Sequence, residues 1–275
     1  MGNLWKGFKE HRTFRFTSLL VILLIALVVL APVIAPYNPL EAVMKDANQA
    51  PSMAHLFGTD KLGRDVLSRI LYGGAYSLSS VLALVAIIFC VGTFLGLVAG
   101  YFGGLIDTVI MRVADMMISF PGVILAIAIA GIMGGSLVNA MIALTAVTWT
   151  KYARLSRSMV LKIRKRDFVD AAIVSGGTSS HILWTHIMPN VVPILVITAV
   201  SDIGAMMMEL AGLSFLGFGS QPPAPEWGLM LNEGRQQLQT APGLMVFPGL
   251  AIFISVVIFN LWGDALRDVL DPRDQ

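Results

Sequence analysis

Residues 70–106 read ILYGGAYSLSSVLALVAIIFCVGTFLGLVAGYFGGLI and contain no charged side chain. A helix of about 20 apolar residues crosses the hydrocarbon core of a bilayer. We therefore expect a membrane span within this run, at about Leu78–Tyr101. The glycines at positions 92, 96 and 100 lie on one face of that helix, a pattern that favours close packing against another helix. The spacing leaves open whether the second helix belongs to this chain or to a partner.

The whole chain shares this apolar character. Of its 275 residues, 56% are hydrophobic and 13% are charged, whereas soluble domains have about 25% charged residues. The chain has too little polar surface to face water on all sides, so a lipid bilayer is its expected environment and no nucleic acid partner is expected. The only cysteine, Cys90, lies in an apolar run, which excludes an internal disulfide and a C-x-x-C metal site.

Further apolar runs predict five more spans. Phe16–Ala35 is expected to be an uncleaved first helix, because its apolar run exceeds the roughly 7–15 residues of a signal-peptide core. Gly134-Gly135-Ser136 interrupts a long uncharged stretch, which predicts a hairpin of two short arms. The hairpin arms and the last two predicted spans are about Ile118–Met133, Leu137–Thr150, Val191–Ala211 and Leu244–Trp262.

Basic residues predict the orientation of these spans. Seven of them crowd one connection: Lys151, Arg154, Arg157, Lys162, Arg164, Lys165 and Arg166. With six crossings, the same side also holds Lys6, Lys9, Arg12, Arg15, Arg112, Arg267 and Arg273. The other side holds Lys45, Lys61, Arg64, Arg69 and Arg235. Because cytoplasmic loops carry the excess of Lys and Arg, both termini and the connection 151–190 are expected in the cytoplasm.

The predicted organisation follows from the spans and their orientation. It consists of a cytoplasmic N-terminus (1–15), a first transmembrane helix (16–36), an extracellular or periplasmic segment (37–77), a core of five transmembrane helices (78–266) and a cytoplasmic C-terminus (267–275). A second external connection, 212–243, contains Gln221-Pro222-Pro223-Ala224-Pro225, which predicts a rigid extended turn.

Motifs of catalysis and tight metal binding are missing from the sequence. The stretch Gly58–Asp65 echoes a phosphate-binding loop, but Arg64 and Asp65 replace the required Lys and Ser/Thr. His181 and His186 are five residues apart, about 140° around an α-helix, so they are not expected to form a metal pair. Neither H-E-x-x-H nor G-x-S-x-G occurs. The chain is therefore not expected to be an enzyme or to bind a metal tightly.

The cytoplasmic connection carries the most specific motif. It reads Asp170-Ala171-Ala172-Ile173-Val174-Ser175-Gly176, then nine residues, then His186-Ile187-Met188-Pro189. This resembles the E-A-A…G…P loop of ABC-importer permeases, with Asp170 in place of Glu. The resemblance implies a short helix along the membrane surface that docks into a groove on a separate ATPase. Its coupling residues would be Asp170, Ala171, Ala172, Gly176 and Pro189.

Longer stretches resemble the dipeptide, oligopeptide and nickel permeases of that class: residues 55–69, 213–219, 226–228 and 260–272. The resemblance implies an all-α integral membrane protein with about six helices and the type I importer fold, in a bacterial or archaeal cell (inner) membrane. It also implies a sister permease subunit in a heterodimer, two ATP-binding subunits and an extracellular solute-binding protein. ATP and Mg would be used by the partner ATPases, and no cofactor would be bound by this chain.

Four stretches look most like the nickel-importing members, specifically their second (C-type) permease subunit: Met111–Met116, Arg164–Val169, Asp202–Met207 and Leu250–Val256. The expected function is therefore translocation of nickel ion or a nickel chelate. The alternative is a dipeptide or oligopeptide importer. A more remote alternative is an ATP-independent channel or carrier.

Two acidic residues lie within a predicted span. Asp202 and Glu209 are seven residues apart, so they share a helix face, and Met206 lies one turn from Asp202. A charge near mid-membrane costs roughly 2.5–3.5 kcal/mol and usually faces a polar pathway. Carboxylate and thioether groups could transiently contact a cation or chelate, which makes these three residues translocation pathway candidates. The alternatives are a hydrogen bond from Asp202 to the sister subunit, an external gate at Glu209, and simple packing for Met206.

Overall fold

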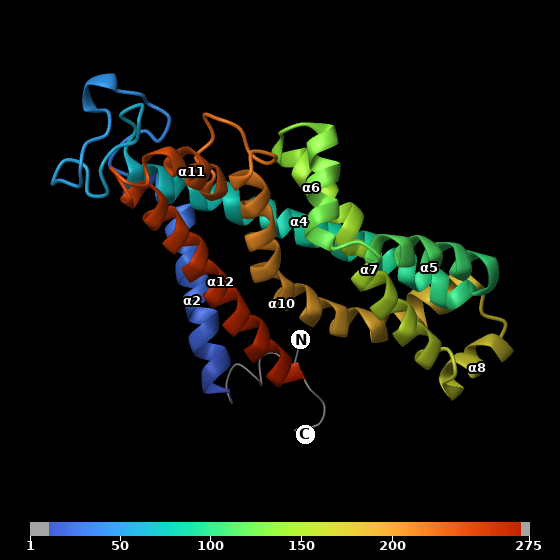
Figure 1. The fold of residues 1–275 in the computed structure, drawn as a ribbon. Coiled ribbons are helices and arrows are strands. Elements are labelled where there is room, and N and C mark those ends of the chain that lie inside the picture. The colour runs from blue at the N-terminus through green and yellow to red at the C-terminus, as the bar shows by residue number, and fades with distance from the viewer. Residues whose placement is uncertain (1–10, 271–275) are drawn as a thin grey trace. The chain divides into compact units, whose positions relative to one another are not determined.

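The computed structural model describes residues 11–270 (Figure 1), and over this range all its regular elements are helices. Lys6, Lys9 and Arg273, which contribute to the predicted orientation, lie outside the described residues. The longer helices are α2 (Arg12–Val29), α4 (Val66–Phe102), α5 (Gly104–Ile118), α6 (Gly122–Met133), α7 (Leu137–Ile163), α10 (Met188–Phe215) and α12 (Gly243–Leu270). The shorter ones are α3 (Ala31–Ile34), η1 (Met44–Asp46), α8 (Asp167–Val174), α9 (Ser179–Ile182), η2 (Leu183–Ile187), α11 (Trp227–Gly234) and η3 (Arg235–Gln237).

The fold class is confirmed, whereas the count of six spans is not. Within residues 11–270, four helical runs are long and apolar enough to cross a membrane: α2, α4, Ser179–Phe215 and α12. Helices α5 and α6 form a pair bent by 93°, and counting this pair as one broken span gives five. The hairpin predicted at 134–136 is present, since α6 ends at Met133 and α7 begins at Leu137.

Several helices extend beyond the predicted spans. Helix α4 begins at Val66, twelve residues before the predicted start, and so takes in part of the predicted external segment. Helix α7 continues to Ile163, so the first third of the basic connection is helical. The connection 212–243, in which the sequence predicts a turn only at Gln221–Pro225, also contains helix α11 directly after the proline-rich stretch. The uncharged runs used to place the spans miss these extensions, because charged residues such as Arg69, Lys151 and Glu233 lie within them.

The described residues fall into two compact units. One contains the residues up to Ala83, Ala130–Met141 and the residues from Val200 on, and the other contains Leu84–Ile129 and Ile142–Ala199. In the first unit, α2 lies alongside α12 (Figure 1). Phe14 packs there in a cluster with Ala265, Leu266 and Val269. The first helix is thus held by apolar contact with the last one.

In the second unit, the glycines of α4 pack directly against α7. A Cβ atom at Gly92 would lie 2.5 Å from the carbonyl oxygen of Trp149, and one at Gly96 would lie 2.3 Å from that of Ala153. At Gly100 it would lie 2.8 Å from the Cβ of Val160. The open question about this glycine pattern is therefore answered, because the partner helix belongs to the same chain.

Candidate functional site

Helix α8 forms where the sequence predicts a coupling helix. Arg166, in extended conformation, precedes it, and the first turn carries Asp167 and Asp170, whose carboxylates complement the positive end of the helix. Gly176 follows the helix with φ +81°, a conformation that glycine adopts without steric cost. The amide of Gly177 then donates to the carbonyl of Ala172 at 3.0 Å, so the helix ends in a tight left-handed turn.

Helix α8 exposes several apolar side chains. Only Val169 is buried, which anchors the helix to the rest of its unit. Phe168, Ile173 and Val174 are 45%, 51% and 87% exposed. Exposed apolar side chains of this kind occur on surfaces that contact another protein or a membrane. Three of the five predicted coupling residues (Asp170, Ala171 and Gly176) are exposed beside them, and Ala172 is half-buried.

The fifth predicted coupling residue, Pro189, lies apart from α8. It is the second residue of α10 and is exposed. Because α9, η2 and α10 form one continuous helical run, Ser179–Phe215, a proline here removes one backbone donor from that run. Between α8 and α10 lie the short helix α9, capped by the side chain of Thr178, and the turn η2. The role of these five residues in coupling stays a prediction.

The C-terminal part of α7, which leads into α8, is fastened to α5 and to the end of α4. Arg157 forms a bidentate ion pair with Asp107, with its Nη2 at 2.5 Å from Oδ2. Arg154 pairs with Asp115, one turn nearer the start of α7. The Nη1 of Arg164 donates to the carbonyl of Tyr101 at 2.8 Å. Three of the seven clustered basic residues thus have partners in their own unit.

The three pathway candidates all lie on α10. Asp202 and Glu209 are half-buried. Met206 is only 5% exposed, within the packing of its own unit. A side chain so enclosed does not line an open pathway in this conformation, which favours the packing alternative for Met206. For the two carboxylates the pathway role stays a prediction.

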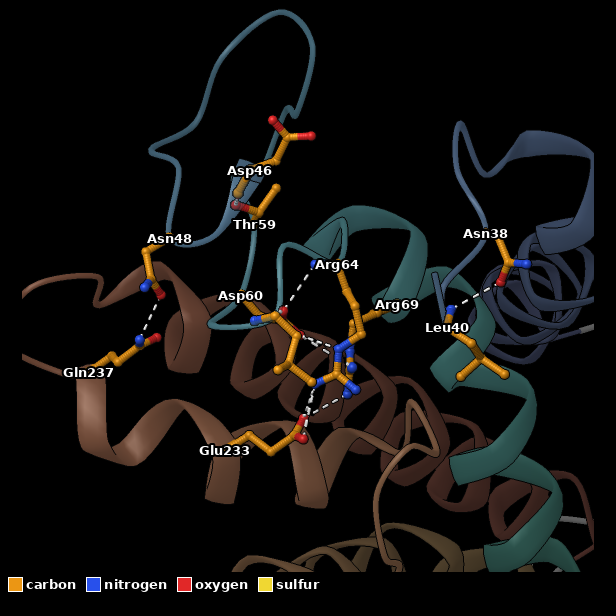
Figure 2. A network of polar contacts seen from close by, with 11 residues as sticks. Asn38, Leu40, Asp46, Asn48, Thr59, Asp60, Arg64, Arg69, Glu233 and Gln237 are labelled. Atoms are coloured by element: carbon orange, nitrogen blue, oxygen red, sulfur yellow. Dashed lines mark hydrogen bonds and ion pairs between the residues drawn. The ribbon is translucent and has the colours of Figure 1, made fainter. Parts of the chain in front are cut away.

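A buried ionic network that the sequence does not predict joins the segment predicted to be external (37–77) to α11 (Figure 2). The side chains of Arg64 and Arg69 are 2% and 1% exposed. Arg64 donates from Nε to Asp60 at 2.6 Å, and Arg69 donates from Nη2 to Glu233 at 2.7 Å. Two positive and two negative groups balance there, as buried charges must. These four residues are called the external network below.

Further contacts hold the rest of the external segment in place. His55 Nδ1 lies 2.9 Å from Asp65. The rings of Phe57 and Phe247 stack with centroids 4.2 Å apart, and Gln237 donates to Asn48 at 2.6 Å (Figure 2). Although it has little regular secondary structure, the segment is therefore tied at several points to its own unit.

Glu226 caps the N-terminus of α11. Its carboxylate accepts hydrogen bonds from the amides of Gly228 and Leu229 at 2.8 and 2.9 Å, and its own side chain is buried. Burial raises the pKa of this carboxyl above its ordinary value of 4.5, and the two amide hydrogen bonds oppose that shift. Because Glu is not among the usual N-cap residues Ser, Thr, Asp and Asn, no standard capping signal in the sequence locates α11.

His181 and His186 lie closer than an α-helix would place them. The rings of His181 and His186 have centroids 5.7 Å apart and are inclined at 83°. The separation of about 140° assumed an α-helix, whereas residues 183–187 form a π-helical turn. Within residues 11–270, no three His, Cys, Asp or Glu side chains are grouped so that they could hold a metal ion.

With α8 and the all-helical core described, comparison with known proteins identifies the class. The chain belongs to the family of binding-protein-dependent transport system inner membrane components, whose model matches residues 92–273. The model for the N-terminal transmembrane domain of oligopeptide transport permease C matches residues 1–51. The chain is therefore an ABC-importer permease subunit, a multi-pass inner-membrane protein and not itself an enzyme, which acts with an ATPase and a binding protein.

Two kinds of relative have similar identity to the chain. The glutathione transport system permease protein GsiD of Pectobacterium atrosepticum is 42% identical over 98% of this chain and 90% of its own length. The nickel transport system permease protein NikC of Escherichia coli K12 is 43% identical over 93% of both chains. A chain of the inward-facing MetNI methionine ABC transporter is 18% identical over 74% of this chain and 98% of its own, with a TM-score of 0.58, which indicates a shared fold.

Proposed function

We propose that this chain is one of two different permease subunits in an ABC importer for nickel ion or a nickel chelate. An extracellular binding protein delivers the cargo, and two ATP-binding subunits drive transport, using the ATP and Mg. Both termini and α8 lie in the cytoplasm, as the distribution of basic residues indicates. The observation that carries the coupling part of this proposal is α8, a short exposed helix with apolar side chains and a left-handed glycine cap.

Coupling through α8 is tested by a substitution at its cap. A Cβ atom at Gly176 would meet nothing within 4 Å, so a large side chain there disturbs only the turn and the docking surface. In a reconstituted complex, Gly176→Leu should abolish ATP-driven uptake while the chain still inserts and assembles. Gly134→Leu is the matched control, because Gly134 also has positive φ (+85°) and open space around it but lies in the α6–α7 turn. Normal uptake by Gly176→Leu would contradict the proposal and favour an ATP-independent channel or carrier.

The nickel assignment is supported by the 43% identity to NikC and by the four stretches that resemble nickel permeases. A peptide cargo is the second candidate, supported by 42–43% identity to GsiD proteins over 98% of the chain. The two cargoes differ in what the binding protein must recognise. Titration of the partner binding protein with nickel, nickel–histidine, dipeptides and glutathione should show binding of nickel or its chelate only. Binding of a peptide alone would transfer the assignment to the second candidate.

A weak cation contact in the pathway is tested at Asp202. Uptake of radioactive nickel by the reconstituted complex should be slowed by Asp202→Ala, because a carboxylate facing the pathway interacts with the passing cation. The neighbouring Met208→Ala is the control, since Met208 is exposed on the same helix and carries no charge. Unchanged uptake kinetics in Asp202→Ala would remove this residue from the pathway.

A further inference from the structure

The segment between α8 and α10 contains a turn with an unusual helical period. Residues 183–187 are π-helical, between the α-helical turns of α9 and α10. In an α-helix, side chains five positions apart point about 140° away from each other. The wider π turn, with its i→i+5 hydrogen bonds, brings them to the same face, and such turns occur often at functional sites. His181 and His186 are the two residues that this turn brings together.

The separation of the two rings suits a shared metal ion. With metal–nitrogen bonds of about 2.0–2.1 Å, two imidazoles on one ion place their centroids about 4.5 Å apart at a right angle and about 5.2 Å apart at a tetrahedral angle. The observed distance is 5.7 Å, so a closure of about 0.5 Å by side-chain rotation brings both rings onto a tetrahedral ion.

The surroundings leave the rings accessible and partly oriented. His181 is exposed and His186 is half-buried. The hydroxyl of Thr185 lies 3.3 Å from Nδ1 of His181, which leaves Nε2 of that ring for a ligand and resembles the outer contacts that orient metal-binding histidines. No third protein ligand is grouped with the pair in the part of the chain described, so water would complete the coordination.

We propose that His181 and His186 form a two-histidine binding site for a divalent late first-row transition ion such as Ni²⁺, Cu²⁺ or Zn²⁺, the ions that imidazole ligands suit. The site lies in the connection that follows the coupling helix, so a bound ion would hold the π turn between α9 and α10 in one conformation. The binding chemistry is independent of the transported cargo. Only the placement of the site on the cytoplasmic side depends on the proposed function.

The site is tested on the purified complex of permeases and ATPases without the binding protein. Titration with Cu²⁺ should give an electron paramagnetic resonance spectrum with nitrogen hyperfine structure from two imidazoles. Titration with Ni²⁺ should show that the unsubstituted complex binds one more ion than the complex carrying the double substitution His181→Ala/His186→Ala. Either single substitution should weaken this binding at least about tenfold, since loss of even an outer contact of a ligating histidine costs 10- to 100-fold. His11→Ala is the control, because His11 is exposed and distant in sequence.

Hydrogen exchange supplies a second readout that transport does not affect. Ni²⁺ should slow amide exchange in residues 181–187 of the unsubstituted protein and have no effect there in the double variant. Equal Ni²⁺ stoichiometry and equal Cu²⁺ spectra in the two proteins would overturn the site. A binding protein that recognises only peptides would instead overturn the nickel cargo and leave the site standing, so the two failures are distinguishable.

Discussion

Arg64 and Glu233 are 169 positions apart in the sequence, yet Nη2 of the arginine donates to both carboxylate oxygens of the glutamate, at 3.0 and 3.1 Å. Arg69 reaches the same carboxylate (Figure 2). Glu233 therefore balances two guanidinium groups that are almost fully buried. The external segment is thus attached to α11 through this carboxylate, in addition to the hydrogen bond from Nε1 of Trp227 to the carbonyl of Ile70 at 2.9 Å.

Replacing Glu233 by Gln should strongly destabilise the external part of the chain. The substitution keeps the shape of the side chain but leaves Asp60 as the only carboxylate of the network beside two buried arginines. Breaking a buried ion pair costs about 3–5 kcal/mol, which corresponds to a fall in melting temperature of roughly 5–15 °C. The measurement is thermal unfolding of the purified complex in lipid nanodiscs.

The matched control for this substitution is Glu41→Gln, because Glu41 is an exposed acid of the same external segment. Removing an exposed charge usually changes stability by less than about 0.5 kcal/mol. A melting temperature that falls equally in the two variants would show that the loss of a negative charge, rather than the network, accounts for the change.

The external network is a part of the structure that the sequence does not predict. The uncharged run predicts the membrane-embedded length of α4, since composition alone determines whether a helix can sit in lipid. The start of α4 at Val66 does not follow from composition, because Arg69 lies within the helix and is neutralised by a residue distant in sequence. No local pattern identifies Glu233 as that partner.

Enlarging Gly96 should separate α4 from α7. A Cβ atom there would lie 2.3 Å from the carbonyl oxygen of Ala153 and 2.6 Å from the Cβ of Ser156, so the backbones must move apart to admit Gly96→Leu. Overpacking of this kind costs about 1–3 kcal/mol. The expected result is a lower melting temperature and a smaller yield of assembled complex.

Gly212→Ala is the control for that substitution. Gly212 is helical and a Cβ atom there meets nothing within 4 Å, so the change should leave stability equal or slightly higher. If Gly96→Leu assembled and melted like the unsubstituted chain, the close contact between α4 and α7 would be refuted.

The ion pair between Arg157 and Asp107 should contribute to stability as a pair. Asp107→Asn removes the charge that the guanidinium of Arg157 contacts through two nitrogens. Because both side chains are partly exposed, the loss should be about 0.5–1 kcal/mol. Reversing both charges, Asp107→Arg with Arg157→Asp, should recover part of this loss relative to either reversal alone. Additive effects of the two reversals in a double-mutant cycle would show that the pair is not formed.

The candidate site was predictable to different extents. The position and ends of α8 follow from local signals, namely first-turn carboxylates, two alanines and a glycine stop. The proximity of His181 and His186 does not follow from local signals, because it depends on the π-helical turn at 183–187. An α-helical period would instead separate the two side chains by about 140° around the helix. The burial of Met206 depends on packing against residues distant in the sequence, which the sequence of α10 alone does not predict.

The stability contribution of Glu226 should depend on pH. Burial raises the pKa of its carboxyl above 4.5, so the folded protein holds this proton more tightly than the unfolded chain does. The stabilisation that this tighter proton binding supplies is therefore fully present below pH 4.5 and is lost as the pH rises through the folded-state pKa. Glu226→Gln cannot ionise and lacks this dependence, while keeping one oxygen for the amides of α11.

The quantity to measure is the melting temperature of the unsubstituted complex minus that of the Glu226→Gln complex, across pH 4 to 8. Subtraction removes the contribution of other titrating groups, provided that the two proteins have the same fold. The difference should decrease as the pH rises above about 4.5, because ionising the buried carboxylate costs free energy in the folded protein alone. A difference that increases with pH would mean that the amide hydrogen bonds from Gly228 and Leu229 outweigh burial, so that the carboxylate is stabilised in its charged form.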